Sequence, residues 1–244
     1  MPAALHPTQP PARTLGWRWL LLAAALPGTA ALAQPESPWL LRHTDPDTGT
    51  QVWLRDRGDQ VPAFRASTRV AARLSSLAAL LLDSERMPAW VYRTRSVQQL
   101  QQDGVQQGVS LVVTAMPWPL DDRESVVAWR MTQAAKTRVV TLSGQGVEPA
   151  GQPWLPEPAP DRVRMPSFAS QWVFAPVADS AGQVDVVFEG HGDPGGSLAS
   201  PLLRGFVAAA IWEAPLQTVN ALRRMMQRPE YSDAVLPFIT EPGP

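Results

Sequence analysis

The stretch Gly192-Asp193-Pro194-Gly195-Gly196-Ser197-Leu198 and the long segment after it decide the fold of this chain. Proline fixes φ and the two glycines permit positive φ, so the stretch predicts a tight reversal. Apolar residues then recur at helical spacing from about Ser200 to Gln227, which predicts one long helix with a single apolar stripe. The stripe consists of Leu202, Leu203, Phe206, Val207, Ala210, Leu216, Val219, Leu222 and Met226.

Short apolar or alternating runs between turn residues precede this helix and predict strands. They span residues 51–54, 61–70, 90–97, 109–116, 125–132, 137–143, 163–177 and 183–189. We also expect a helix over Ala71–Asp83, a short helix around Trp39–His43 and a proline-rich loop over Val147–Pro160. Short turns between neighbouring strands favour antiparallel pairing, because parallel pairs need long crossovers. The pattern predicts an α+β fold in which the final helix covers an antiparallel sheet.

Residues 1–33 have the pattern of a signal peptide that is removed on export. Arg13 and Arg18 form a positive region, Trp19–Leu26 is an unbroken apolar run, and Ala31-Leu32-Ala33 matches the small-x-small cleavage pattern. The apolar run is shorter than the roughly 20 residues that a spanning helix needs, which favours cleavage over a membrane anchor. We therefore expect an exported protein, located in the periplasm or outside the cell.

The mature chain, residues 34–240, is expected to form a single domain, since no linker divides it into independently patterned halves. The net charge of the full chain is −1, which gives no support for a nucleic-acid partner. There is no cysteine, and this excludes disulfides, cysteine nucleophiles and thiolate metal sites.

Three stretches resemble the START (StAR-related lipid-transfer) family. Residues 116–124, Met-Pro-Trp-Pro-Leu-Asp-Asp-Arg-Glu, look like the family's Pro-aromatic-Pro loop with the arginine after it. Residues 192–198 are similar to its Asp-Pro-Gly-Gly turn, and residues 214–223 to the later half of its last helix. The three occur in the family's order, and the resemblance covers nearly all of residues 38–228.

The resemblance implies a helix-grip fold, in which a curved antiparallel sheet wraps around a long C-terminal helix and leaves a tunnel for one lipid. It further implies that the loop Met116–Arg123 and the final helix border the tunnel entrance. Pro215 is expected to kink that helix or to start a new turn in it. We expect Trp118, at the loop tip, to act as a gate or to touch a membrane. The expected tunnel lining is Phe64, Val113, Trp129, Trp172, Phe188, Leu203, Phe206 and Val207.

The chain departs from the family inside the expected tunnel. Many relatives pair an acid on the strand before the loop with an arginine six residues after the loop's own arginine. The corresponding positions here are Val113 and Trp129, and Arg130 lies one residue too far, on the other face of its strand. A strand bulge near Ala128 would return Arg130 to the interior. Without the charged pair, the tunnel floor is expected to be apolar and its ligand to have little internal polarity.

The remaining polar residues have structural explanations that are simpler than catalysis. His191 and Asp193 provide too few ligands for a metal site, and an aspartate in such a turn bonds to the backbone. Asp121, Asp122 and Glu124 form an acidic cluster that we interpret as a solvated loop rather than as an acid–base pair.

Three functions fit the sequence. The preferred one is a carrier without catalytic residues, metal or cofactor, which binds a lipid, fatty acid or sterol-like molecule and contacts membranes transiently. The second is a cyclase or hydrolase on the same scaffold, with Arg130, His191 and Asp193 as its candidate polar cluster. The third is a partner-binding module whose tunnel is filled by side chains.

Overall fold

The computed structural model describes residues 37–58, 61–148, 152–178, 180, 182–196 and 201–243. The expected signal peptide lies outside the described residues, as do Ser197 and Leu198 of the predicted reversal. The strands are β1 (Leu40–Thr44), β2 (Gln51–Arg55), β3 (Ala63–Ala71), β4 (Thr94–Gln102), β5 (Gln107–Thr114), β6 (Asp122–Gln133), β7 (Val140–Gly146), β8 (Arg162–Arg164), β9 (Ser167–Pro176) and β10 (Gln183–Asp193). The helices are α1 (Leu74–Leu82), the 3-10 helix η1 (Ser84–Ala89), α2 (Pro201–Met225) and α3 (Pro229–Ser232).

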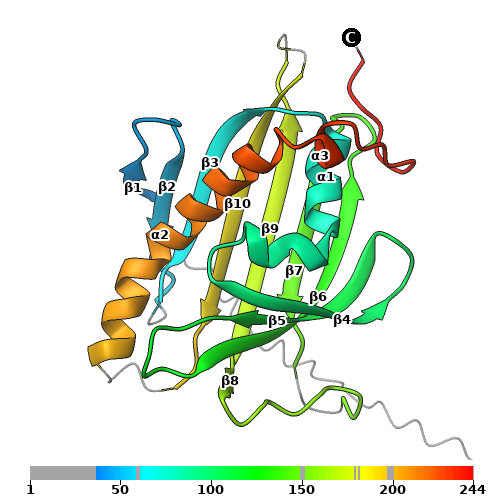
Figure 1. The fold of residues 1–244 in the computed structure, drawn as a ribbon. Coiled ribbons are helices and arrows are strands. Elements are labelled where there is room, and N and C mark those ends of the chain that lie inside the picture. Colours follow the sequence, from blue (N-terminus) through cyan, green and yellow to red (C-terminus); the bar gives the residue numbers. More distant parts are fainter. Residues whose placement is uncertain are drawn as a thin grey trace, which may run out of the picture. The chain divides into compact units, whose positions relative to one another are not determined.

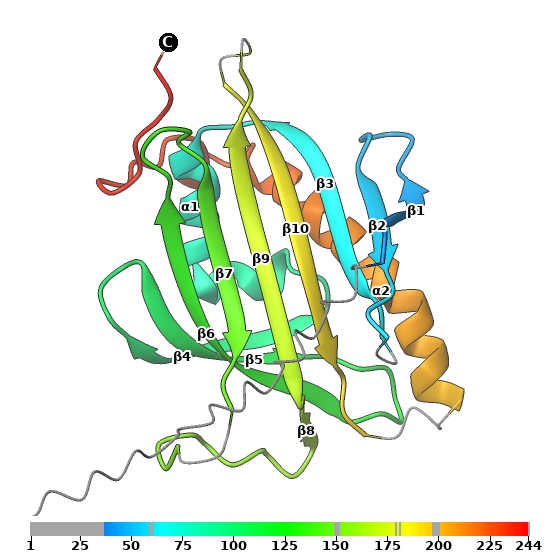
Figure 2. The same ribbon diagram turned by 180° about the vertical axis from the view of Figure 1, so that it is seen from behind.

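The strands form one sheet in the order β1-β2-β3-β10-β9-β7-β6-β5-β4, and every neighbouring pair on this path is antiparallel. The short strand β8 pairs with β6 in parallel. Both α1 and α2 lie on the same face of the sheet (Figures 1 and 2). The predicted α+β fold, an antiparallel sheet covered by a long C-terminal helix, is confirmed.

The short helix expected around Trp39–His43 is wrong, because residues 40–43 belong to the edge strand β1. Leu40 and Leu41 pair with Leu54 and Trp53 of β2, and a bulge follows before His43. Pairing with β2 satisfies the backbone groups of a segment too short to form a stable helix alone. The adjoining turn is as predicted, since the Asp45 carboxylate accepts hydrogen bonds from two backbone N–H groups of the turn.

Only part of the predicted apolar stripe on α2 is buried. Leu216, Val219 and Leu222 belong to the main core, which also contains α1 and the inner face of the sheet. The N-terminal half of α2 has a single buried side chain, Leu203, whereas Leu202 is 47% exposed. Figure 1 shows this end of α2 projecting past β2. The two halves meet at Pro215, which lies within one continuous helix, so no new helix starts there.

Hydrogen bonds hold the C-terminal half of α2 against the sheet and the turn before β2. Arg223 donates to the hydroxyl of Thr68 on β3 at 2.9 Å. Asn220 contacts three residues of the turn between β1 and β2, which are Asp45, Thr48 and Thr50. One half of α2 is thus anchored to the sheet by both packing and polar contacts.

Candidate ligand-binding site

A cavity of about 170 Å³ lies on the inner face of the sheet, between strands β4, β5, β6, β7, β9 and β10 and the α1–η1 segment. Among the described residues that line it, none is charged or a histidine. Its aromatic lining residues are Trp90, Trp129, Phe168, Trp172 and Phe188. Its polar lining residues are Ser84, Thr94, Gln99, Ser110 and Ser170. The site is therefore suited to an uncharged apolar group.

Three of the expected tunnel residues meet here. Trp172 and Phe188 face each other on β9 and β10 and stack at 4.1 Å between ring centroids, while Trp129 lines the cavity from β6. Phe64 joins this cluster through an edge-on contact of 5.0 Å with Phe188. Trp90 packs edge-on against Trp172 at 6.0 Å. Such offset and edge-to-face pairs are the arrangements that aromatic rings prefer, so the cavity wall is well packed.

Trp129 occupies the position where many relatives have the arginine of a charged pair. Here it belongs to a chain of hydrogen bonds between uncharged side chains. Its Nε1–H donates to Ser110 Oγ at 3.1 Å, and the Ser110 hydroxyl donates to Gln99 Oε1 at 3.3 Å. Ser110 and Val112 line the cavity from β5, whereas Val113 is buried on the opposite face of that strand. The hydrogen-bond partner of Trp129 is therefore Ser110, and the expected lining residue Val113 does not face the cavity.

Arg130 lies outside the cavity. It is exposed and pairs with Gln107 on β5 and Ser143 on β7, and both ladders run through Ala128 without a bulge. The strand alternation therefore holds, and Arg130 points to the opposite face from Trp129.

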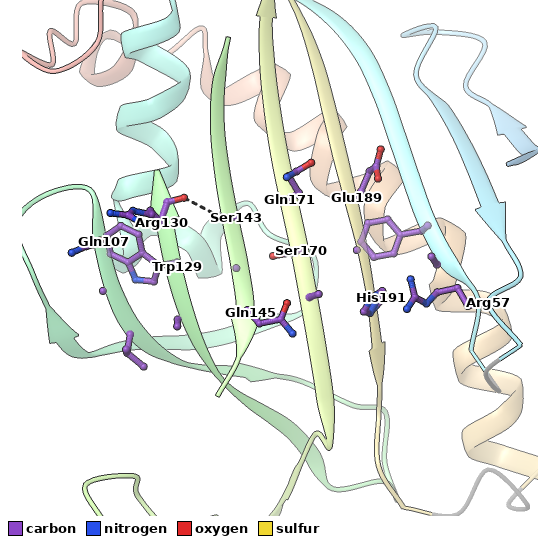
Figure 3. A pocket seen from close by; sticks show the side chains of 18 of the residues that line it. Arg57, Gln107, Trp129, Arg130, Ser143, Gln145, Ser170, Gln171, Glu189 and His191 are labelled. Carbon is purple, nitrogen blue, oxygen red and sulfur yellow. Dashed lines mark hydrogen bonds between the residues drawn. The ribbon is translucent and has the colours of Figure 1, made fainter. Parts of the chain in front are cut away.

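The outer face of the sheet carries an open groove of about 800 Å³, which shares Trp129, Gly144 and Ser170 with the lining of the inner cavity and is also lined by Phe64 (Figure 3). Its polar lining includes Arg130, Ser143, Gln171 and Glu189, which occupy one row across neighbouring strands. His191 also lines this groove. Because the groove is open and has charged side chains such as Arg130 and Glu189 in its lining, it is less suited to burying a lipid, and we regard the inner cavity as the candidate site.

The expected tunnel residues on α2 do not line the inner cavity among the described residues. Leu203 is buried, whereas Phe206 and Val207 are half-buried on the N-terminal half of the helix. The guanidinium of Arg93 lies 5.3 Å from the ring centre of Phe206, and Arg93 itself has a positive φ of 55°. Trp118 is 90% exposed, as expected for a loop tip.

Sequence reasoning overlooked the α1–η1 side of the cavity. Leu81, Leu82, Met87 and Val91 line it from that side, together with Trp90. The available signal was the return of apolar residues at Met87 and Trp90-Val91, after the polar run Asp83–Arg86 that ends the Ala- and Leu-rich helix. That signal shows burial, but it does not show which cavity the residues face.

Arg123 connects the two loop motifs. Its side chain is 5% exposed, its Nε donates to the Pro194 carbonyl at 2.7 Å, and its Nη1 donates to the Asp121 carbonyl. Burial lowers the pKa of this guanidinium from its usual value, and the nearby Asp121 opposes that shift. The Asp-Pro-Gly-Gly turn has its expected form, with positive φ at Gly195 and Gly196. The Asp193 side chain bonds to the Gly195 N–H at 2.8 Å, also as expected.

Replacing Arg123 by lysine is expected to lower the free energy of unfolding by about 2 kcal/mol, because a lysine cannot hold both carbonyls in one planar fork. Urea unfolding measures the loss. Arg224→Lys on the exposed side of α2 is the control and should change stability by less than about 0.5 kcal/mol. An equal effect of both substitutions would contradict the bridging role of Arg123.

The family model of the START domain matches residues 32–228 of this chain. The chain belongs to the START domain family. An uncharacterized Pseudomonas aeruginosa protein is 27% identical over 212 residues, which cover 86% of this chain and 97% of that protein. A crystal structure of a STAR-related lipid transfer protein fragment from Xanthomonas axonopodis is 25% identical and covers 78% of this START chain and 99% of its own, with a TM-score of 0.65.

The human StAR-related lipid transfer protein 5 shares the fold of this START chain, with a TM-score of 0.62 at 15% identity. The match covers 80% of this chain and 88% of the human one. Membership in the START family indicates that the protein binds a lipid or another hydrophobic ligand. In the described ranges, no helix is long and apolar enough to cross a membrane. The same ranges contain no group of three or more His, Asp or Glu residues that could hold a metal ion.

Proposed function

We propose that this START protein is a non-enzymatic carrier that binds one lipid-like molecule in the inner cavity. The observation that supports this is the cavity lining, which is rich in aromatic residues and free of charged groups among the described residues. Transfer of an apolar group from water into such a site gains about 25 cal/mol per Å² of apolar surface. A ligand is held there without any chemical step.

The volume of the cavity sets a condition on ligand entry. Small-molecule sites are usually about 300–1,000 Å³, whereas this cavity holds about 170 Å³. A complete lipid therefore enters only if the cavity widens. The N-terminal half of α2, which the structure describes in full, does not itself line the cavity, but it has one buried side chain and contacts Arg93 through Phe206. Arg93 lies in the chain between the lining residues Val91 and Thr94, so movement of α2 would act on the cavity wall through Arg93. Pro215 interrupts the backbone hydrogen bonds where a hinge is needed.

The loop that carries Trp118 is proposed to contact a membrane while ligand is exchanged. Its indole ring is 90% exposed, and such rings favour the membrane interface. Trp118→Ala is expected to reduce binding to neutral phosphatidylcholine vesicles by about tenfold, since a large apolar ring is lost. Sedimentation with vesicles measures this. The control is Trp154→Ala, which removes a less exposed tryptophan from another loop and should leave vesicle binding within about twofold of wild type.

Native mass spectrometry of protein purified from its own compartment tests the carrier function. We expect a one-to-one complex whose ligand is released into organic solvent and identified as a neutral lipid-like compound. Empty protein that also fails to take up fluorescent lipids would contradict the proposal and favour a partner-binding module.

Export is a second part of the proposal and rests on the pattern of residues 1–33. Cell fractionation should place the protein in the periplasm or the medium, with an N-terminus at Gln34. Full-length protein that remains in the cytoplasm would contradict this.

The cyclase or hydrolase alternative loses support from the placement of its candidate residues. Arg130 and His191 lie at the outer groove, and Asp193 holds the turn through its bond to Gly195. Alanine at each of the three positions is expected to leave ligand binding unchanged.

A further inference from the structure

Trp90 carries an unusual polar group. Its Nε1–H is buried and has no hydrogen-bond partner, and it is the one such side-chain atom among the described residues. The residue is 4% exposed, follows the end of η1 and lines the inner cavity. A buried donor without a partner costs free energy comparable to a lost hydrogen bond, so its presence in a cavity wall needs an explanation.

A second of the three described tryptophans that line the cavity has a hydrogen-bond partner for its indole N–H. Trp129 donates its Nε1–H to Ser110, and Ser110 is in turn bonded to Gln99. The edge-to-face contact of Trp90 with Trp172 offers at most a weak N–H to ring interaction, which does not replace a full hydrogen bond. Trp90 therefore combines an unused buried donor with a place in the cavity wall, beside other aromatic side chains.

We propose that the bound ligand is uncharged and presents an acceptor oxygen, such as that of a ketone, aldehyde, ester or ether, to Trp90 Nε1–H. This inference rests on the proposed function and narrows its ligand class. A carboxylate or phosphate is disfavoured inside the cavity, because no charged side chain among the described lining residues would compensate its desolvation.

A matched pair of probes isolates the acceptor. Acetophenone and α-methylstyrene have nearly the same shape, and they differ in carrying C=O or C=CH₂. The dissociation constants of both are measured by tryptophan fluorescence on wild type, Trp90→Phe and Trp129→Phe. We expect the affinity of acetophenone relative to α-methylstyrene to fall about tenfold in Trp90→Phe, because its carbonyl loses the donor. In Trp129→Phe the ratio should stay within about twofold, because that N–H is already used by Ser110.

A measurement on the wild type gives the same information if Trp90→Phe fails to fold. In ¹⁵N-edited NMR spectra, the indole N–H signal of Trp90 should move to lower field with acetophenone and not with α-methylstyrene. A ratio unchanged by Trp90→Phe, or equal shifts with both probes, would overturn the role of Trp90. Absence of binding by both probes and by fluorescent lipids would instead overturn the proposed function itself.

Discussion

Replacing Glu124 by leucine is expected to lower the free energy of unfolding by about 3 kcal/mol, one of the two largest effects that we predict. Glu124 is 1% exposed and lies on the face of β6 opposite the cavity. Arg164 donates to it at 2.8 Å through Nε, and Arg162 lies 3.6 Å away. Removal of the carboxylate leaves the partly buried guanidinium of Arg164 without its anion, and Arg162 with only the exposed Asp161 at 4.0 Å among the described residues.

The same ion pairs hold the proline-rich loop that contains Pro156 against the sheet. Arg164 lies on β8, which pairs with β6, and its Nη2 donates to the Pro156 carbonyl at 2.8 Å. Equilibrium unfolding in urea measures the effect. Asp185→Asn serves as the control, because the Arg69–Asp185 pair is about half exposed on both sides and such pairs contribute at most about 1 kcal/mol. An equal decrease in the free energy of unfolding for the two variants would contradict the stabilising role of the Glu124 ion pairs.

Asn220→Ala is expected to lower the free energy of unfolding by a similar amount, about 3 kcal/mol. The hydroxyls of Thr48 and Thr50 lie 3.0 and 2.8 Å from Asn220 Oδ1. Thr50 is fully buried, so its hydroxyl loses a partner that water cannot replace. Because these contacts anchor the C-terminal half of α2, the variant should also expose the core to hydrogen exchange near α2 before the rest of the sheet opens.

Gln217→Ala is the matched control for Asn220, since Gln217 is exposed on the same helix turn and should change stability by less than about 0.5 kcal/mol. Loss of stability without faster exchange at α2 would contradict the anchoring role of Asn220.

This anchor should also depend on pH. Backbone hydrogen bonding from Asp47, and then the side chain of Asn220, lower the pKa of Asp45 from 3.8. A lowered folded-state pKa gives stability that is present above pH 3.8 and is lost as the pH falls through the folded value. In acid titrations, the difference in the free energy of unfolding between wild type and Asn220→Ala should therefore shrink as the pH falls below 3.8.

Some of the residues that the resemblance implied for the tunnel lie together in the structure. Trp129, Trp172 and Phe188 were expected in the tunnel and do line one cavity, because strand alternation fixed which residues of β6, β9 and β10 face inward. Val113 does not line the cavity, because it lies on the face of β5 opposite Ser110 and Val112. Glu124 was expected to be a solvated loop acid and is instead buried, since β8 covers it from far along the chain.

The sequence by itself determined the local structural elements of this protein. These are the Asp-Pro-Gly-Gly reversal, the long final helix, and strands whose short turns require antiparallel order, because each depends on the conformational preferences of neighbouring residues. The tertiary structure alone decided which half of α2 is buried, which tryptophan N–H finds a partner, and how wide the cavity is. Those features depend on how side chains distant in sequence pack together, and no local pattern encodes the space that remains between them.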